Sequence, residues 1–201
     1  MSRERGVRFA DFVRGWNDLV GFATPAHHIR IADWLERVVE REKRGLLLAF
    51  RASGKSTIVA IFIVWLLLRD QNLRALVVAA DERLAKKMVR SVKRIIELHP
   101  ETRGLVPKNK IEWGSGSFTI ERPNPTLRDP SVMAIGLGGN ITGSRADVII
   151  CDDVEVPRNS DTSAKREELR EKLLELQFVL TPEGAQIFIG TPHAEKSIYK
   201  V

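Results

Sequence analysis

The sequence predicts an α/β domain in which helices flank a mostly parallel sheet, and three observations lead to this prediction. The chain has 201 residues, a length that suits one domain with a substantial core. The leucines at 46–48 run into a tight loop and then into the apolar stretch Ile58–Leu68, which is the order of a buried strand, a loop and a buried helix. A second apolar run, Val148–Cys151, ends directly in acidic residues, and parallel sheets place ligand-binding groups at such strand ends.

Composition limits the classes of protein to which the chain can belong. Hydrophobic residues make up 43% and charged residues 29% of the sequence, which is ordinary for a globular protein. The single cysteine, Cys151, excludes an internal disulfide, argues against a zinc site and fits a reducing compartment. The formal net charge of +6 permits a nucleic-acid partner without establishing one. Ile58–Leu68 is too short to span a bilayer, so we expect no membrane association.

The loop after the first strand has the pattern of a phosphate-binding P-loop. The template is G-x-x-x-x-G-K-[ST], and the chain has A-F-R-A-S-G-K-S, with Ala49 at the first glycine position. Gly54 lets the backbone approach a phosphate, Lys55 supplies a positive charge, and Ser56 supplies a hydroxyl for Mg²⁺. The start of the following helix also favours an anion. We expect ATP to contact Arg51, Ala52, Ser53, Gly54, Lys55, Ser56 and Thr57.

Three acidic residues follow the apolar run that ends at Cys151. Asp152 and Asp153 stand at the C-terminal end of the predicted strand, and Glu155 lies two residues further on. The spacing suits a Walker B element, in which one carboxylate holds Mg²⁺ and a second polarises the attacking water. We assign Asp152, with Ser56, to the metal. The second acid is either Glu155 or Asp153, because glutamate commonly follows the aspartate directly and the chain has aspartate there.

The first 44 residues are predicted to form helices. Apolar residues recur there at helical spacing, at Phe9, Phe12, Val13 and Trp16. A second helix is expected to start with Thr24 as its N-cap and Pro25 at its first position. His27 and His28 fall in its first turn, just upstream of the P-loop. Either one of them contacts the adenine base, or both are packing or surface residues.

A long helix is predicted at residues 82–98, after a strand at Ala75–Ala80 and with Asp81 as its N-cap. Positive residues dominate its polar side, namely Arg83, Lys86, Lys87, Arg90, Lys93 and Arg94. Such a surface either tracks a nucleic-acid backbone or is an ordinary solvated helix face. The sequence leaves both interpretations open.

The C-terminal part supplies the remaining predicted elements. Short strands are expected at 118–121 and 131–136, an amphipathic helix at 162–178, a turn at 181–184 and a last strand at 186–189. Arg145 follows a glycine-rich loop and either reaches the phosphate of a neighbouring subunit or is a surface arginine. Thr191 follows the last strand and either senses the γ-phosphate or belongs to a simple turn.

In order and spacing, these motifs resemble the ATPase domain of the large terminase subunit of tailed bacteriophages. The resemblance rests on the arginine three residues before the last P-loop glycine, on I-T-G-x-R-A-D leading into I-I-C-D-D-x-E, and on the later I-G-T-P-H. It covers about residues 20–200. It implies a P-loop ATPase of the additional-strand, catalytic-glutamate class that uses ATP and Mg²⁺ to pump double-stranded DNA into a procapsid.

The resemblance also implies roles for single residues and partners for the chain. Arg51 matches the arginine that these enzymes carry inside the phosphate loop, and Thr191 matches the hydroxyl of their coupling motif. The stretch around Pro25 and His28 resembles their adenine-binding segment. Arg145 is the candidate for an arginine acting in trans within a homo-oligomeric ring. The implied partners are the portal of the procapsid and the small terminase subunit, and the implied location is the host cytoplasm.

The sequence departs from the family pattern at two points. Asp153 stands where many members have glutamate, and the sequence ends at Val201, before the lid and the RNase H-like nuclease domain of the family. We expect a single ATPase domain, with N-terminal helices and an adenine-binding segment at 1–44, an ATPase core at 45–201 and no nuclease domain. The alternatives are a helicase-like ATPase fragment that acts on nucleic acid and a non-catalytic P-loop module that binds DNA or protein.

Overall fold

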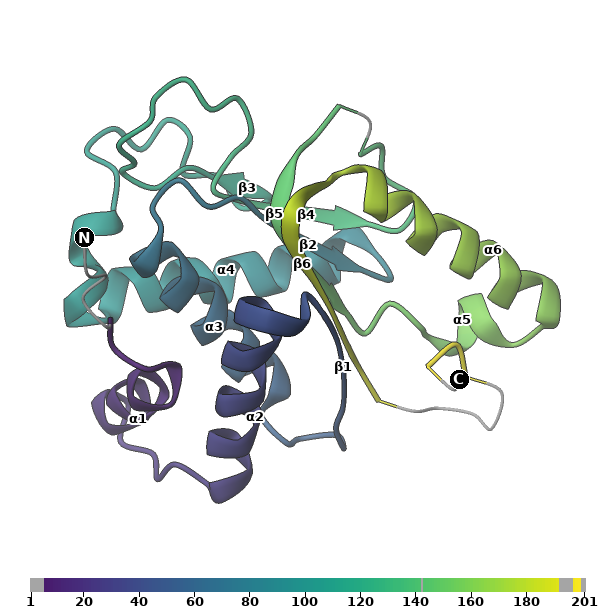
Figure 1. The fold of residues 1–201 in the computed structure, drawn as a ribbon, viewed down its shortest axis with the longest axis horizontal. Helices are drawn as coiled ribbons and strands as arrows, with labels where there is room; N and C mark the ends of the chain where they lie inside the picture. The colour runs from purple at the N-terminus through teal and green to yellow at the C-terminus, as the bar shows by residue number, and fades with distance from the viewer. Residues whose placement is uncertain (1–5, 142, 192–196, 200–201) are drawn as a thin grey trace.

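The computed structural model describes residues 6–141, 143–191 and 197–199. A central six-stranded sheet has the order β1-β6-β5-β2-β4-β3 (Figure 1). The pairs β1–β6, β6–β5, β5–β2 and β2–β4 are parallel, and only β3–β4 is antiparallel. The strands are β1 (Arg44–Leu48), β2 (Ala75–Ala79), β3 (Ser117–Phe118), β4 (Val132–Gly136), β5 (Ala146–Asp152) and β6 (Leu180–Gly190). The predicted α/β class is confirmed.

Helices cover both faces of the sheet. One face carries the larger apolar core and packs against α1 (Phe9–Leu19), α2 (Ala26–Arg37), α3 (Lys55–Arg69) and α4 (Glu82–Leu98) (Figure 1). The π-helix η1 (Val38–Glu42) follows α2, and the 3₁₀ turn η2 (Pro100–Leu105) follows α4. The opposite face packs against α6 (Ser163–Glu175) and η3 (Leu176–Phe178). The one-turn helix α5 (Pro157–Ser160) contacts α6.

Helix α3 is the buried centre of the larger core. Its residues 58–67 are all buried, as expected for a helix that is apolar on every side. Helix α1 packs onto it through the rings of Phe9 and Phe62, whose centroids lie 5.0 Å apart. Trp65 donates from Nε1 to the carbonyl oxygen of Val7 at 2.8 Å. Because α3 begins at the P-loop, this packing anchors the phosphate site. In the described part of the chain, no helix has the length and apolar character to cross a membrane.

Several local predictions agree with the structure. Helices α1, α3 and α4 lie where apolar spacing placed them, and α6 with η3 spans the predicted helix at 162–178. Asp81 caps α4 by accepting from the backbone N–H of Leu84 at 2.9 Å. The predicted strand at 118–121 is shorter than expected, because β3 contains only Ser117 and Phe118.

The first strand differs from its prediction in burial. We expected the strand at 46–48 to be buried, but β1 lies at an edge of the described sheet. Leu46 and Leu48 remain 40% and 43% exposed. Alternate residues of a strand point to opposite faces, so only Leu47 packs against the larger core. A run of three leucines does not distinguish a central strand from an edge strand.

Two predicted boundaries are wrong. Strand β6 runs from Leu180 to Gly190 without the turn expected at 181–184, and these residues form a bulge because Ala146 pairs with Leu180 while Val148 pairs with Ala185. Helix α2 starts at Ala26 and not at Pro25. Pro25 is the N-cap residue and no side-chain hydrogen bond caps this helix. The hydroxyl of Thr24 instead accepts from Nδ2 of Asn17 at 2.9 Å.

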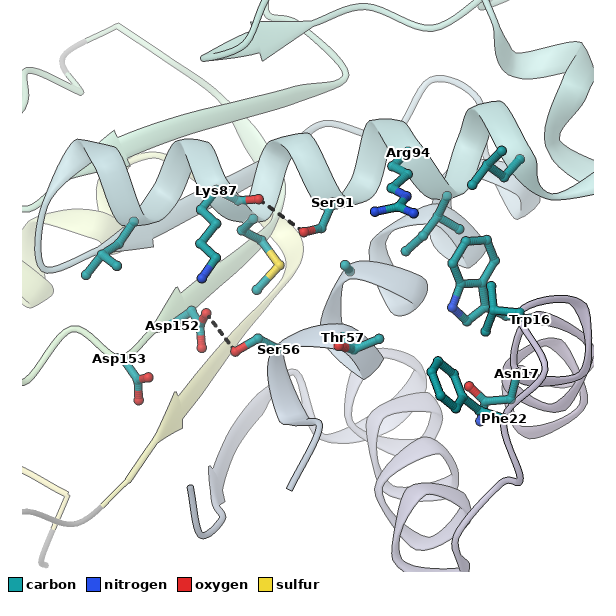
Figure 2. Close-up of a pocket in the computed structure, with 16 residues that line it drawn as sticks. Trp16, Asn17, Phe22, Ser56, Thr57, Lys87, Ser91, Arg94, Asp152 and Asp153 are labelled. Carbon is teal, nitrogen blue, oxygen red and sulfur yellow. Dashed lines mark hydrogen bonds between the residues drawn. The ribbon is translucent and has the colours of Figure 1, made fainter. Parts of the chain in front are cut away.

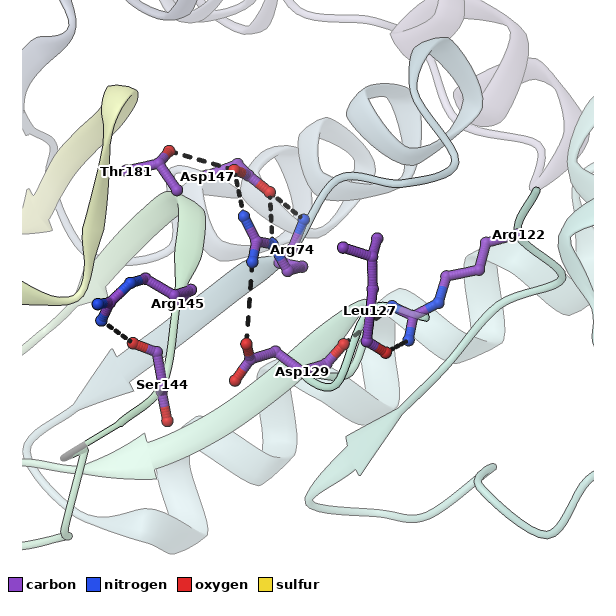
Figure 3. A network of polar contacts seen from close by, with 8 residues as sticks. All are labelled: Arg74, Arg122, Leu127, Asp129, Ser144, Arg145, Asp147 and Thr181. Atoms are coloured by element: carbon purple, nitrogen blue, oxygen red, sulfur yellow. Dashed lines mark hydrogen bonds and ion pairs between the residues drawn. The ribbon is translucent and has the colours of Figure 1, made fainter. Parts of the chain in front are cut away.

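A polar network joins β2, β5 and β6 at the edge of the sheet where β2 and β5 begin (Figure 3). Nε of Arg74 donates to Oδ2 of Asp147, and Nη2 of Arg74 donates to Oδ1, each at 2.9 Å. Thr181 donates to Asp147 Oδ1 at 3.1 Å, and Asp129 lies 3.8 Å from Arg74. Burial alone would raise the pKa of Asp147, but the hydrogen bonds from Arg74 outweigh it and lower the pKa. Asp147 therefore has a structural role that its place in a motif did not reveal.

Candidate active site

The loop between β1 and α3 has the backbone of a phosphate cradle. Ala52 and Gly54 both have positive φ angles, 63° and 77°. A Cβ atom at residue 54 would lie 2.7 Å from the ring of His28, so glycine is required there for conformation and for space. Helix α3 starts at Lys55, and the free N–H groups of its first turn adjoin the loop. The predicted phosphate loop is therefore built from a strand end and a helix start.

Two histidines brace this loop from α2. His27 and His28 each place Nε2 near the carbonyl oxygen of Ser53, at 3.1 and 3.0 Å. Because a carbonyl oxygen only accepts, Nε2 carries the proton in both rings. Nδ1 of His28 is buried and has no hydrogen-bond partner among the described residues. Pro25 precedes α2, is exposed, and accepts from the N–H of His28 at 2.9 Å through its carbonyl oxygen. The predicted adenine-binding stretch thus contacts the phosphate loop directly.

The acids at the end of β5 meet the P-loop across the sheet (Figure 2). Ser56 donates from Oγ to Oδ2 of Asp152 at 3.4 Å. Lys55 places Nζ at 3.4 Å from Oδ2 of Asp153. Asp153 has a positive φ of 44°, and its N–H donates to the carbonyl oxygen of Ile189 in β6 at 2.8 Å. The structure therefore brings together the residues predicted to bind phosphate and metal.

The electrostatics of this cluster favour a bound cation. Burial, reinforced by the charge of Asp153, raises the pKa of Asp152 to about 6, against the lowering effects of Lys55 and Ser56. Oδ1 of Asp152 and Oδ1 of Asp153 are buried without hydrogen-bond partners among the described residues. Unpartnered carboxylate oxygens beside a hydroxyl suit Mg²⁺, which takes oxygen ligands, keeps several waters and is commonly completed by phosphate. The described residues contain no group of three or more His, Cys, Asp or Glu that could hold a metal by itself.

A groove of about 710 Å³ opens from this cluster. It begins at Ser56, Thr57, Asp152 and Asp153 and continues between α3 and α4 toward the end of α1 (Figure 2). Along α4 it is lined by Lys87, Ser91 and Arg94, and at its far end by Trp16 and Phe22. Lys87 extends from α4 toward Asp152 in Figure 2. Sequence reasoning placed Lys87 only within a basic helix, because nothing local shows which side of α4 borders the groove.

Glu155 occupies a different environment from Asp153. Its side chain is 1% exposed, and it is not among the residues that line the groove. Its Oε2 accepts from Oγ of Ser197 at 2.7 Å and from the N–H of Ile198 at 2.9 Å. Asp153 does line the groove. The sequence left open which of these two acids polarises the attacking water. In the structure, the two acids lie in different environments.

Thr191 lies beside the P-loop, and Arg51 lies within it. Thr191 donates from Oγ1 to the carbonyl oxygen of Ala49 at 3.3 Å, and the N–H of Ala49 donates to the carbonyl oxygen of Gly190 at 3.1 Å. The end of β6 is thus hydrogen-bonded to the start of the loop. Arg51 is exposed. Pro192, the third residue of the predicted coupling motif, lies outside the described residues.

Arg145 lies far from the P-loop of its own chain. It directly precedes β5, whereas Asp152 ends that strand, and at 3.3 Å per residue the two are about 20 Å apart. Its Nη1 donates to the carbonyl oxygen of Ser144 at 3.1 Å (Figure 3). An action of Arg145 on the ATP of its own chain is therefore excluded by distance. Both alternatives of the prediction, a role in trans and a surface arginine, are compatible with this exposed position.

The strand order and the site together define the fold class. Strand β6 lies between β1, which leads into the P-loop, and β5, which ends in the acids. This inserted strand is the feature that names the additional-strand class of P-loop ATPases, and the predicted fold is confirmed.

The sequence comparison names a more particular relative. The chain is 40% identical over 160 residues to the large terminase subunit of Enterobacteria phage T3, a match that covers 79% of this chain and 27% of that protein. This confirms the predicted resemblance to the large terminase subunits of tailed bacteriophages. The chain spans about a quarter of the length of this relative. No family model matches the chain.

Solved structures agree on the fold. The HK97 bacteriophage large terminase matches with a TM-score of 0.63 and 13% identity, over 94% of this chain and 38% of that one. A variant of a large terminase ATPase domain from a Thermus phage matches with a TM-score of 0.52 and 18% identity, over 90% of this chain and 70% of that one. S. cerevisiae Dbp5, in a complex that contains ADP, matches with a TM-score of 0.54 and 12% identity, over 92% of this chain and 47% of that one. At these identities the likeness concerns the fold alone.

Proposed function

We propose that this chain is an Mg²⁺-dependent ATPase domain that powers the translocation of double-stranded DNA into a procapsid. One observation carries the proposal: Lys55 and Ser56 of the P-loop lie 3.4 Å from Asp153 and Asp152, respectively, and Ser56 and both acids line one groove. The relationship to a phage large terminase subunit supports DNA packaging as the purpose of hydrolysis. The domain forms one ATPase unit from the N-terminal helices through β6.

Each residue of the site has its own role in ATP hydrolysis. Lys55 and the backbone N–H groups of the P-loop hold the β- and γ-phosphates, and Ser56 and Asp152 hold Mg²⁺, which when bound neutralises charge on those phosphates. Asp153 orients and polarises the attacking water, because it faces the groove and Glu155 does not. His28 and Pro25 position the loop beside the base. Thr191 links the phosphate site to β6.

Arginines complete the site within a homo-oligomeric ring. Arg51, exposed in the loop, serves the ATP of its own chain, and Arg145 serves that of a neighbour. The ring works in the host cytoplasm with the portal of the procapsid and the small terminase subunit as partners. Arg145 lies just before β5, at the end of the strand opposite to Asp152, and this distance from the P-loop of its own chain supports a contribution between subunits.

Four cations of α4 are proposed to contact the DNA phosphates. Arg83, Lys87, Arg90 and Arg94 follow at intervals of four, three and four residues, which places them on one face of the helix. In contrast, Lys86 pairs with Glu82 at 2.7 Å, and Lys93 donates to the carbonyl oxygen of Trp113 at 2.9 Å. Within the described residues, the four side chains of this stripe form no salt bridge or side-chain hydrogen bond. Their charges are therefore available to a polyanion.

The proposal is tested by measuring ATP hydrolysis per protomer as the protein concentration rises, with and without double-stranded DNA and with Lys55→Ala as the blank. We expect Mg²⁺-dependent turnover that increases per protomer with concentration, because Arg145 completes the site of a neighbour. A rate no higher than the blank, together with failure to bind ATP, would refute the ATPase proposal. The helicase-like alternative draws support from the fold shared with Dbp5, and strand separation on a forked duplex would favour it.

A further inference from the structure

The buried carboxylate of Glu155 connects two segments that are distant in the sequence. Its Oε2 accepts from Oγ of Ser197 at 2.7 Å and from the N–H of Ile198 at 2.9 Å. Ser197 is itself 3% exposed, and its Oγ also accepts from the N–H of Tyr199 at 3.2 Å. Hydrogen bonds to a carboxylate are about twice as strong as neutral ones, so Glu155 holds the segment 197–199 firmly.

Tyr199 adds a second connection between the same parts. Its hydroxyl oxygen lies 3.4 Å from the N–H of Glu155, which donates to it. Its ring covers the end of β6, because a Cβ atom at Gly190 would lie 2.5 Å from Cε2 of the ring. Val154 is fully buried in the same apolar cluster. We call the contacts of Glu155 with Ser197, Ile198 and Tyr199 the Glu155 clasp.

The clasp encloses the turn that carries Asp153. Asp153 has a φ of 44°, a conformation that is unfavourable for a non-glycine residue and persists only when its surroundings enforce it. Two constraints are present: the N–H of Asp153 donates to Ile189 at 2.8 Å, and the clasp holds Glu155 two residues later. A turn held from both sides keeps the Asp153 carboxylate at the groove.

We infer that Glu155 is a positioning residue, which sets the place of Asp153 relative to the P-loop and ties it to the segment that follows β6. The inference rests on the proposed function for its effect on turnover, whereas the clasp itself is independent of activity. Glu155 therefore acts through the hydrogen bonds that its Oε2 accepts, while its Oε1 is buried without a hydrogen-bond partner among the described residues.

Two substitutions distinguish a positioning role from that of the catalytic acid. The amide oxygen of Gln accepts hydrogen bonds from Ser197 and Ile198, so Glu155→Gln should keep kcat within a few-fold of the original chain. Glu155→Ala removes the two side-chain hydrogen bonds of the clasp, keeps the backbone bond to Tyr199, and should lower kcat up to about 10²-fold, since a small misplacement of a reacting group costs that much. The KM for ATP should change little in either variant. Glu175→Ala, at an exposed acid of α6, is the control.

A catalytic acid behaves differently in this comparison. Loss of a general base costs about 10²–10⁴-fold whether Gln or Ala replaces it. Equal and severe loss of kcat in Glu155→Gln and Glu155→Ala would therefore overturn the inference. Unchanged turnover in Glu155→Ala would overturn it as well, because Asp153 would then be held without the clasp.

The single tyrosine of the chain reports on the clasp without any turnover. Burial raises the pKa of Tyr199 well above its usual value, and the charges of Glu155, Asp153 and Cys151 raise it further. The near-ultraviolet absorbance of tyrosinate should therefore be absent near pH 10 in the original chain and in Glu155→Gln. In Glu155→Ala it should develop at a lower pH than in the original chain, because the charge of Glu155 and its side-chain hold on the segment 197–199 are removed.

The ionisation of Tyr199 tests the clasp independently of ATP hydrolysis. Ionisation of Tyr199 near pH 10 in the original, folded chain would refute the clasp whether or not ATP is hydrolysed. A protected Tyr199 in a chain that neither binds nor hydrolyses ATP would refute the ATPase proposal and the positioning role, and would leave the clasp as a structural contact only. Circular dichroism at the same pH shows that each variant remains folded.

Discussion

The ammonium group of Lys55 lies 3.4 Å from the carboxylate of Asp153, a residue with the positive φ of 44° at the end of the acidic strand. Lys55 is 9% exposed, whereas the side chain of Asp153 is 37% exposed, so solvent screens this ion pair in part. A phosphate bound in the P-loop would share the lysine with Asp153. The pair therefore connects phosphate binding to the acid proposed to orient water.

Replacement of Asp153 by Asn should separate nucleotide binding from turnover. We expect kcat to fall about 10²–10⁴-fold, because the amide does not accept a proton from water. ATP affinity should be kept or increased, because Lys55 no longer has a competing carboxylate. Single-turnover hydrolysis and equilibrium binding of a fluorescent ATP analogue measure the two effects. Asp18→Asn, at an exposed position of α1, is the control, and a normal kcat in Asp153→Asn would reject this role.

Replacement of Lys55 by Ala should remove ATP binding and hydrolysis together. The β- and γ-phosphates lose their main side-chain charge, and the Asp153 carboxylate is left without its partner. Isothermal titration with Mg·ATP and a phosphate-release assay measure the two losses. Lys43→Ala changes a lysine outside the loop and is the matched control. Substantial turnover in Lys55→Ala would contradict the P-loop assignment.

Reversal of charge on the α4 stripe should weaken DNA binding and its salt dependence. For Lys87→Glu with Arg90→Glu, we expect a lower affinity for duplex DNA and a shallower slope of log affinity against log salt, since each lost phosphate contact reduces the slope by about one. Lys86→Glu is the control, because Lys86 already pairs with Glu82. Fluorescence anisotropy over a range of salt concentrations measures both quantities. A raised KM for ATP with unchanged DNA affinity would show that the stripe serves the nucleotide.

Replacement of Asp147 by Asn should lower stability in a pH-dependent manner. The amide keeps one acceptor oxygen but loses the other and the charge, so weaker hydrogen bonds with Arg74 should cost about 1–3 kcal/mol near neutral pH. The pKa of Asp147 is lower in the folded state than the ordinary value of about 3.9, so its contribution is fully present above about pH 4 and is lost as the pH falls through the folded value. Urea unfolding of both chains from neutral to acidic pH measures the difference. A difference that does not shrink below pH 4 would contradict this account.

The local motifs of the site could be predicted from the sequence because each is formed by residues close together in the chain. A P-loop needs a strand, a glycine with positive φ and a helix start within a dozen residues, and Leu46–Ile58 contains all three. Asp81 caps α4 through a contact only three residues away. The apolar run before Asp152 predicts a buried parallel strand. Interactions within a few residues are encoded by the order of those residues.

Other features depended on contacts between distant segments. The burial of Glu155 depends on Ser197 and Ile198, and the bracing role of His27 and His28 depends on their approach to Ser53. No periodicity or spacing signals such contacts. The bulge in β6 depends likewise on its register with β5, which a turn-like sequence does not reveal.

The sequence by itself therefore determined the α/β class, the phosphate loop and the acids at the end of a buried strand, since these rest on local backbone and burial patterns. Only the tertiary structure decided that Asp153 faces the groove while Glu155 is enclosed, that β1 is an edge strand, and that Arg145 lies across the sheet from the P-loop. Each of these depends on strand order or on packing between segments far apart in the chain. Such relationships arise only when the chain is folded.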